Sequence, residues 1–164
     1  KSLHFKIERP EPAFRPYKQN RQFSDRAKVN LNELIPAIIS ELSDLAEFKS
    51  VSVSMVSEAS ITCDMNPELA TIMISNLIKN GIVHNREGGS VTVRISPHGI
   101  TVENTSAATG LDASQIFRRF YKGTSLNTST GLGLSIVRSI ADLYGYQVHY
   151  QYNGMHTFSI EIAC

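Results

Sequence analysis

The sequence predicts an α+β domain, a two-layer α/β sandwich in which three helices pack against a mixed, mostly antiparallel sheet of about five strands. Three observations support this fold class. Apolar residues recur every three or four positions in three segments, which is the period of an amphipathic helix. In other short segments they alternate with polar residues, which is the period of a half-buried strand. Turns at His98-Gly99 and Asn153-Gly154 join neighbouring strands, which favours antiparallel hairpins.

The expected elements follow one another from residue 29 to residue 162. Asn30 or Asn32 can cap the first helix, and Pro36 is tolerated there because it lies near the first turn. Asn66-Pro67-Glu68 is a strong start for the second helix, which is apolar on most sides and is therefore expected to be deeply packed. In chain order we expect a helix at 31–45, strands at 51–55 and 61–63, a helix at 67–83, a hairpin of 91–95 and 100–102, a helix at 133–144, and a hairpin of 148–152 and 158–162.

The length of 164 residues and the composition, 41% hydrophobic and 19% charged, are those of one ordinary globular domain. The net charge of +1 gives no electrostatic case for binding nucleic acid or anionic lipid. Basic residues and three prolines gather in residues 1–28 without a sustained period. We expect a solvated linker or the end of a preceding element there, and a docking surface is the alternative.

The two cysteines and the absence of long apolar runs limit the compartment. Cys63 and Cys164 lie outside any CxxC-like spacing, so neither a disulfide framework nor a zinc site is suggested, which fits a reducing compartment. No apolar run approaches the roughly 20 residues that span a bilayer, and no signal peptide is visible. Because the first residue is Lys1 rather than Met, we expect a fragment of a longer protein whose membrane anchor could lie elsewhere.

Asn76, Asn80 and His84 are spaced by four, so they line one edge of the second helix. Two neutral amides in line can hold a hydrated magnesium ion and phosphate oxygens without adding negative charge that would repel them. The competing interpretation is that these residues border the solvent-exposed face of the helix. The spacing alone does not choose between the two.

A glycine pair opens the third helix in the segment Thr130-Gly131-Leu132-Gly133-Leu134-Ser135. Helix N-termini offer unpaired amides, and glycine lets a phosphate approach the backbone. The signal is weak alone because glycines also serve plain turns. The dinucleotide-binding fingerprint is excluded because Ile136 stands where its third glycine belongs, and the lysine of a P-loop is absent.

The segment Ile116-Phe117-Arg118-Arg119-Phe120-Tyr121-Lys122 combines spaced aromatic rings with three cations that can reach an anion. Taken alone, a small satellite hydrophobic cluster with solvated charges is the better interpretation. Residues 123–130 are almost wholly Gly, Ser, Thr and Asn, which predicts a mobile loop.

In their order along the chain, NLIKN, FRRFYKG, a polar loop and GLGLS resemble the N, F and G2 boxes of histidine kinase ATP-binding domains, which are members of the GHKL superfamily with the Bergerat fold. The resemblance runs from about Val29 to Ile162. Each box is moderately specific, and the ordered set is strong.

The resemblance implies a role for each matching residue. Asn80 corresponds to the Mg²⁺ ligand, and Asn76 corresponds to the residue nearest the phosphates that assists the catalytic transfer. Lys122 corresponds to the basic residue that contacts phosphate, and residues 111–130 correspond to the lid over the nucleotide. The other positions implied to bind ATP are His84, Asn104, Thr130, Gly131, Leu132, Gly133 and Leu134.

The Asp-x-Gly-x-Gly box that holds adenine in this family is absent in its standard form. Asn104 aligns with the aspartate, Ser106 and Ala108 align with the glycines, and Val83 stands where a phosphate-contacting lysine is common. The Asn104 oxygen can accept the same hydrogen bond from the adenine amine, at a loss on the order of 1 kcal/mol. Because an amide can flip, we expect Asn104 to discriminate ATP from GTP less sharply than Asp would.

The resemblance implies that residues 29–164 are the catalytic domain of a two-component sensor histidine kinase, and that residues 1–28 are a linker or the remnant of a preceding dimerisation helix. Such a domain binds Mg-ATP and donates the γ-phosphoryl group to a histidine on a separate dimerisation domain, for relay to an aspartate of a response regulator. His4 lacks the acidic residue that follows the acceptor histidine in the family. The implied setting is the cytoplasmic part of a homodimeric protein anchored in the bacterial inner membrane.

Two other functions stay open on the sequence alone. A degenerate GHKL module would hold nucleotide weakly or not at all and would act as a scaffold. The altered glycine and lysine positions favour it, whereas the retained asparagine pair and glycine pair argue against it. A GHKL serine kinase of the anti-sigma type is the third possibility, and an upstream helix with an acceptor histidine would exclude it.

Overall fold

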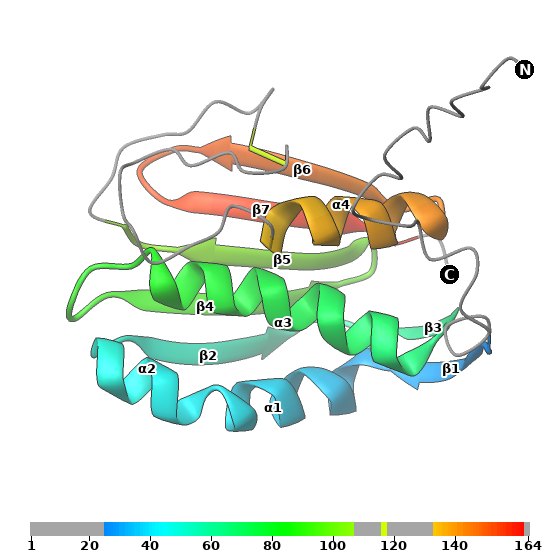
Figure 1. Cartoon of the computed structure of the whole chain (residues 1–164), viewed down its shortest axis with the longest axis horizontal. Helices are drawn as coiled ribbons and strands as arrows, with labels where there is room; N and C mark the ends of the chain where they lie inside the picture. The colour runs from blue at the N-terminus through cyan, green and yellow to red at the C-terminus, as the bar shows by residue number, and fades with distance from the viewer. Residues whose placement is uncertain (1–24, 107–115, 118–132, 163–164) are drawn as a thin grey trace, which may run out of the picture.

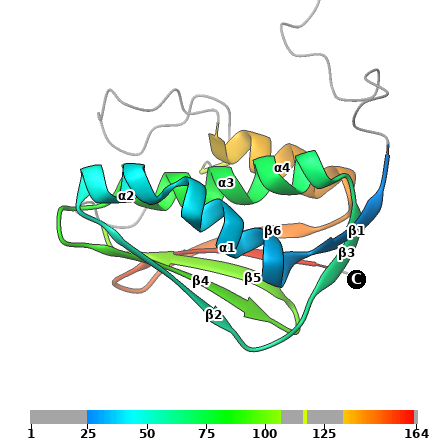
Figure 2. The same cartoon turned by 90° about the horizontal axis from the view of Figure 1, so that it is seen from below.

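In the computed structural model, the helices lie together on one face of a five-stranded sheet, so the molecule has two layers (Figure 1 and Figure 2). The structure describes residues 25–106, 116–117 and 133–162. Its strands are β1 (Ala27–Asn30), β2 (Ser52–Ser57), β3 (Thr62–Met65), β4 (Ser90–Ser96), β5 (Gly99–Asn104), β6 (Gln147–Tyr152) and β7 (His156–Glu161). Its helices are α1 (Leu31–Glu41), α2 (Ser43–Lys49), α3 (Pro67–Val83) and α4 (Gly133–Leu143). This architecture confirms the predicted fold class.

The five-stranded sheet has the order β2-β4-β5-β7-β6. Only the β2–β4 pair is parallel, and the other three neighbouring pairs are antiparallel, as expected for a mixed, mostly antiparallel sheet. The two predicted hairpins are β4–β5 and β6–β7. Strand β5 occupies the centre, and at its end Asn104 lies opposite Val91 of β4 and His156 of β7.

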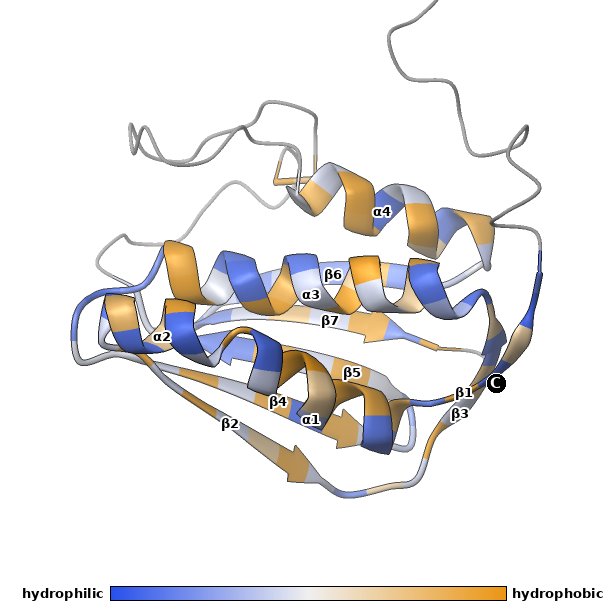
Figure 3. Cartoon of the chain, turned by 60° about the horizontal axis from the view of Figure 1, so that its bottom comes forward, coloured by the Kyte–Doolittle hydropathy of each residue, from blue (hydrophilic) through white to orange (hydrophobic). Residues whose placement is uncertain are grey.

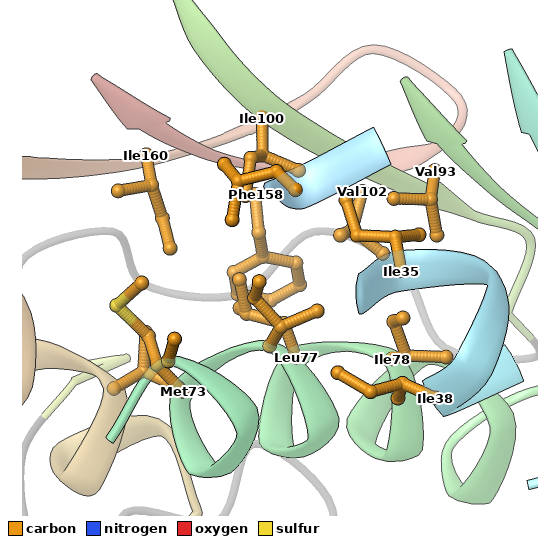
Figure 4. Packing of buried hydrophobic residues seen from close by; sticks show 14 of the residues in the cluster. Ile35, Ile38, Met73, Leu77, Ile78, Val93, Ile100, Val102, Phe158 and Ile160 are labelled. Carbon is orange, nitrogen blue, oxygen red and sulfur yellow. The ribbon is translucent and has the colours of Figure 1, made fainter. Parts of the chain in front are cut away.

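The strict alternation of the strands makes one face of the sheet apolar. In β4, Val91, Val93 and Ile95 are buried, whereas the residues between them are only partly covered. Figure 3 shows hydrophobic stripes on the helices beside the sheet. In Figure 4 the core residues of α1 and α3 meet those of the sheet: Ile35, Ile38, Met73, Leu77 and Ile78 against Val93, Ile100, Val102, Phe158 and Ile160.

Helix α3 lies in the middle of the helical layer, between α1 and α4 (Figure 1). Its start follows the predicted signal, because Asn66 Oδ1 accepts hydrogen bonds from the amides of Glu68 (2.9 Å) and Leu69 (3.1 Å), with Pro67 in the first turn. Eight of its 17 residues are buried, so the expectation of a deeply packed helix is confirmed.

The predicted helix at 31–45 is two helices in the structure, with a break at Leu42 (φ −90°, ψ 2°). The Ser43 hydroxyl donates to the Ser40 carbonyl at 2.8 Å, which occupies an acceptor that a continuous helix would offer to a backbone amide. Apolar periodicity continues across the break, so the pattern alone could not reveal it.

A second, two-stranded sheet was not predicted. Strand β1 pairs antiparallel with β3, with Val29 opposite Cys63, and it begins at Ala27, two residues before the expected start of the domain at residue 29. Residues 1–24 and most of the predicted lid at 111–130 lie outside the described residues. Among the residues that are described, no helix has the length and apolar character needed to cross a membrane.

Candidate nucleotide-binding site

One edge of α3 carries Asn76, Asn80 and His84, the last of which caps the helix at its C-terminus. All three residues are half-buried. A carbon built at the Cβ position of Gly133 would lie 3.3 Å from Asn76 Oδ1, so the first residue of α4 sits directly against Asn76. The asparagine edge of α3 and the N-terminus of α4 therefore face each other, although 57 positions of sequence separate Asn76 from Gly133.

The two asparagines on this edge differ in how they are held. Asn76 Nδ2 donates to the Ile72 carbonyl at 2.8 Å, which leaves its Oδ1 on the side of Gly133. The Asn80 side chain makes no hydrogen bond within the described part of the chain. The first amides of a helix have no partner inside the helix. The start of α4 therefore places hydrogen-bond donors beside the side-chain oxygens of Asn76 and Asn80, which are acceptors. This combination suits a phosphate chain with a bound cation.

Asn104 marks the other end of the site. It is only 3% exposed, and its Cβ lies 3.5 Å from the position that a Cβ on Gly81 of α3 would take. Its Nδ2 donates to the Thr105 carbonyl at 3.0 Å. Its Oδ1 is a buried acceptor without a hydrogen-bond partner in the described structure. Such an unpaired buried oxygen is costly, so it suits a donor on a ligand.

A hydrogen-bond network ties the end of α3 to the end of β5 around Asn104. The Thr105 hydroxyl donates to Asn85 Oδ1 (2.8 Å) and accepts from the Ser90 amide (2.8 Å). Asn85 Nδ2 donates to the carbonyls of Gly81 (3.1 Å) and Ser90 (3.0 Å). The Ser106 hydroxyl donates to the His84 carbonyl at 3.1 Å. The loop after β5 is thus fastened to α3 by side chains, at a place where the aligned family motif has glycine.

The sheet presents a polar row at the same end. Because directly paired residues share a face, Asn104 of β5, His156 of β7 and Tyr152 of β6 point toward the helical layer together. His156 is 3% exposed, stacks near Tyr150 with 5.8 Å between ring centroids, and shares a 2.7 Å hydrogen bond between Nδ1 and the Tyr150 hydroxyl. The neighbouring row consists of Val93, Val102, Phe158 and Tyr150, and the Tyr150 hydroxyl turns toward His156, so the polar atoms gather at this end.

His84 is the ionisable group of this end whose pKa is clearly displaced. Burial lowers the pKa of His84 below its usual value of 6.5, and the positive charge of Lys49 and the nearby His156 lower it further. His84 is therefore neutral near pH 7. A neutral imidazole can lie beside an uncharged base without the cost of desolvating a charge.

Of the aromatic segment, Ile116 and Phe117 are described. Ile116 is buried, and the Phe117 ring meets Phe158 edge-on with 6.2 Å between centroids. Phe117, the first of the spaced aromatic rings, therefore contacts the core, whereas Phe120 lies outside the described residues. Lys122, Thr130, Gly131 and Leu132 lie outside the described residues, whereas Leu134 is half-buried and packs against the core.

One family model matches residues 65–163, and its description is "Histidine kinase-, DNA gyrase B-, and HSP90-like ATPase" (HATPase_c). The chain belongs to this family. The matched region holds all the predicted site residues from Asn76 to Leu134, so the resemblance carried by the ordered boxes is confirmed.

Relatives of this HATPase_c domain include sensor proteins. The sensor protein QseC of Salmonella typhi is 30% identical over 130 residues, which are 77% of this chain and 29% of QseC. The heme sensor protein HssS of Staphylococcus saprophyticus is 34% identical over 121 residues, which are 71% of this chain and 26% of HssS. The chain thus spans less than a third of the length of these curated relatives.

Solved structures share the fold of the domain. The catalytic domain of histidine kinase ThkA, in a nucleotide-free form, superposes with a TM-score of 0.71 at 23% identity, covering 84% of this chain and 95% of that chain. The cytoplasmic segment of histidine kinase QseC gives a TM-score of 0.67 at 20% identity, covering 85% and 79%. Histidine kinase catalytic domains therefore have the same architecture as this HATPase_c domain.

Sequence reasoning missed the residues that support the site. Thr105 and Asn85 carried no recognisable signal, because their roles depend on a turn that brings α3 back toward β5. The sequence did contain a signal for His156, because strand alternation places it on the same face of the sheet as Phe158. Its position opposite Asn104 could not be predicted, because it depends on the register between β5 and β7, which are not consecutive strands in the sequence.

A separate groove lies at the other end of α3 in the HATPase_c domain. Its volume is about 340 Å³, and Arg26, Tyr144 and Tyr146 are among its lining residues. The Tyr144 hydroxyl accepts from the backbone amide of Asn66, the N-cap of α3, whereas His84 is the C-cap. At 1.5 Å per residue, about 25 Å of helix separates the two ends. The groove is therefore distinct from the site at the asparagine edge.

Proposed function

We propose that this chain is the ATP-binding catalytic domain of a two-component sensor histidine kinase. The observation that carries the proposal is the contact between Asn76 of α3 and Gly133 of α4, which brings two distant sequence motifs to one site. Membership of the HATPase_c family and similarity to the sensor proteins QseC and HssS support it.

At the phosphate end, we assign the triphosphate to the space between the α4 N-terminus and the asparagine edge. Backbone amides at Gly131 and Gly133 would donate to phosphate oxygens, and Lys122 would supply a positive charge. Asn76 would orient the γ-phosphoryl group. The half-buried amide of Asn80 fits a Mg²⁺ ligand, because its oxygen is neutral and is not used by another described residue. Bound Mg²⁺ would neutralise charge on the phosphates.

At the base end, the residues fit adenine. The exocyclic amine of adenine is a donor, and Asn104 Oδ1 is a buried acceptor that lacks a partner among the described residues. Pairing the two would remove the cost of the unsatisfied oxygen. Neutral His84, at the end of the same helix edge, would cover the base. Asn76 and His84 are eight residues apart on α3, about 12 Å at 1.5 Å per residue, so base and phosphates would lie along one edge.

The acceptor of the phosphoryl group would be a histidine on a dimerisation domain, with residues 1–28 as the linker or helix remnant that leads to residues 29–164. A nitrogen of that histidine attacks the γ-phosphorus, and the bond to the β–γ bridging oxygen breaks to leave ADP. The phosphoryl group would then pass to an aspartate of a response regulator. The domain would work in the cytoplasm, as part of a homodimer anchored in the bacterial inner membrane.

The test is phosphorylation of the parent sensor protein with ATP labelled at the γ-position. Wild type should form an acid-labile phosphohistidine, and Asn80→Ala should slow its formation by about 100-fold or more, the scale expected when charge stabilisation at a reacting group is lost. Asn153→Ala is the matched control, because Asn153 lies exposed in the β6–β7 turn.

Three results would contradict the proposal. Wild-type rates in Asn80→Ala would remove the assignment of the site. An acid-stable phosphoester would favour the serine kinase alternative. Retained nucleotide binding without any phosphorylation would favour the degenerate scaffold module.

A further inference from the structure

The net charge changes sign along the chain. Eight of the 16 basic residues but only three of the 15 acidic residues lie in residues 1–28, which gives this segment a net charge of +5. Residues 29–164 hold the other eight basic residues and twelve acidic residues, a net charge of −4. A basic segment at the start of an acidic domain attracts acidic partners to that end of the chain.

This basic segment leads into the groove at the start of α3. Asn66 caps α3 with its Oδ1, and its Nδ2 donates to the Asp25 carbonyl at 3.1 Å, so the entering chain is fastened to the helix start. Strands β1 and β3 lie at this end of the molecule (Figure 2). The groove has a volume of about 340 Å³, and its lining residues are Arg26, Lys28, Thr62, Cys63, Asp64, Tyr144 and Tyr146.

Arg26 is held by stacking and keeps its hydrogen-bond donors free. Its guanidinium carbon lies 5.1 Å from the centroid of the Tyr144 ring, which stacks on Tyr146 with 5.8 Å between centroids. The Tyr144 hydroxyl accepts from the Asn66 amide at 2.9 Å, which fixes the ring under the guanidinium. The Arg26 side chain makes no hydrogen bond or ion pair with any described residue. Its N–H groups are therefore available to an oxyanion.

Lys28 and Asp64 give the groove one more cation and one carboxylate. They are opposite each other in the pairing of β1 with β3, and both are exposed. Neither makes an ion pair or a side-chain hydrogen bond within the described part of the chain. Two cations, one carboxylate and an aromatic wall suit a peptide, which brings carboxylates, N–H groups and side chains. The dense phosphates of a nucleic acid or an anionic membrane would be repelled by Asp64.

We propose that this groove is a docking surface for an acidic segment of a protein partner. Arg26 and Lys28 bind carboxylates of the segment, Asp64 accepts from its backbone N–H groups, and the exposed side of Tyr144 contacts a neighbouring side chain. The basic residues among residues 1–24 attract the partner to this end of the chain. The groove lies at the opposite end of α3 from the asparagine edge, so docking needs no nucleotide.

The experiment measures binding of a fluorescein-labelled peptide, Glu-Glu-Tyr-Glu-Glu, to the whole chain by fluorescence anisotropy. Arg26→Glu should weaken binding by about 10-fold or more, because an attractive contact becomes a repulsive one. Lys28→Glu is a second variant with the same expectation. Arg26→Lys should weaken binding by about 3-fold, because it keeps the charge and loses the planar group that stacks on Tyr144. Arg86→Glu is the matched control, since Arg86 is exposed beyond the other end of α3, and it should stay within about 2-fold of wild type.

Two further measurements locate the binding and identify its kind. Backbone amide shifts in NMR spectra should change at residues 25–28, 62–64 and 144–146 when the peptide is added, with or without Mg-ATP. Vesicles that contain phosphatidylserine should bind more weakly than the peptide. No binding of the peptide, an equal loss in Arg26→Glu and Arg86→Glu, shifts centred on other residues, or tighter binding to the vesicles would each overturn the docking surface. None of these results depends on nucleotide binding, so a failure of the proposed function is recognised separately.

Discussion

Single residues at the two ends of the site are held to different degrees. Asn104 belongs to a network with Thr105, Asn85 and Ser90, whereas Asn80 has no hydrogen bond within the described part of the chain. In the proposed site, the base would meet the acceptor held in this network, and the phosphates would meet the one that is not. This difference suits a site that selects its base rigidly and adapts to the phosphates and a hydrated cation.

His84 gives the stability of the domain a pH dependence. Because its pKa is lowered from 6.5 in the folded state, the unfolded chain binds more protons as pH falls below that value. The stabilisation from a neutral His84 is therefore present above pH 6.5 and is lost as pH falls toward the folded-state pKa.

We expect the unfolding midpoint of wild type to fall as pH is lowered from 7 to 5, and the fall to be smaller in His84→Gln. Thermal unfolding at a series of pH values measures both. His98→Gln is the control, since His98 is exposed in the β4–β5 turn, and it should behave like wild type. Identical pH profiles for wild type and His84→Gln would contradict the assignment.

The sequence alone predicts the positions of only some of the site residues. The four-residue spacing on α3 predicts the edge of Asn76, Asn80 and His84, because helical geometry alone sets it. The orientation of the Asn104 amide depends on where the Thr105 carbonyl points, and no sequence pattern records that direction. The expectation that Asn104 discriminates ATP from GTP less sharply than Asp stays a prediction, and the hydrogen bond from its Nδ2 to the Thr105 carbonyl favours one orientation of the amide.

Among the elements, the turn between α3 and β4 connects the site to the sheet. The Gly89 carbonyl accepts from the Ser52 amide at 3.0 Å, and the Gly88 amide donates to the Ser50 carbonyl at 2.8 Å. Gly89 is buried against Asn85 and Thr105, whereas Gly88 is exposed with a φ of 78° and nothing near its Cβ position. The two adjacent glycines therefore serve different purposes, close packing and a left-handed backbone.

Gly89→Ala should destabilise the domain by about 2–3 kcal/mol, because the added methyl group overlaps Asn85 Oδ1 and Thr105 Oγ1, which hydrogen-bond each other. Gly88→Ala should cost only about 1 kcal/mol, from backbone strain alone. Urea unfolding of both variants measures the difference. An equal cost, or a smaller cost for Gly89→Ala, would show that the network around Asn85 and Thr105 is not tightly packed.

The helices and strands themselves were largely predictable, since every strand of the five-stranded sheet follows an alternating segment. The break at Leu42 was not, because Ser43 competes for a carbonyl while the apolar spacing continues through it. The pairing of β1 with β3 was also missed. It joins segments more than 30 residues apart through four residue pairs, and nothing in the sequence of either strand indicates which strand it pairs with.

In the whole molecule, α3 links the core to the site. Its buried face holds the sheet through residues such as Leu77 and Ile78, and its edge presents the asparagines and His84. The fold class could be predicted because the hydrophobic period of each segment, and the order of helices and strands along the chain, can be read from the sequence itself. The convergence of the α4 N-terminus on Asn76 followed only from the family resemblance, since local patterns do not state which elements become neighbours.

The measurement that tests the central claim most directly is thermal unfolding of this chain with and without Mg-ATP. At a ligand concentration 100 times the Kd, a single site should stabilise wild type by about 2.7 kcal/mol, which is a clear rise in the unfolding midpoint. Asn80→Ala should lose most of that rise at the same concentration, and Asn153→Ala should keep it. If Mg-ATP leaves the wild-type midpoint unchanged, or raises that of Asn80→Ala equally, the edge formed by α3 and the start of α4 is not the nucleotide site.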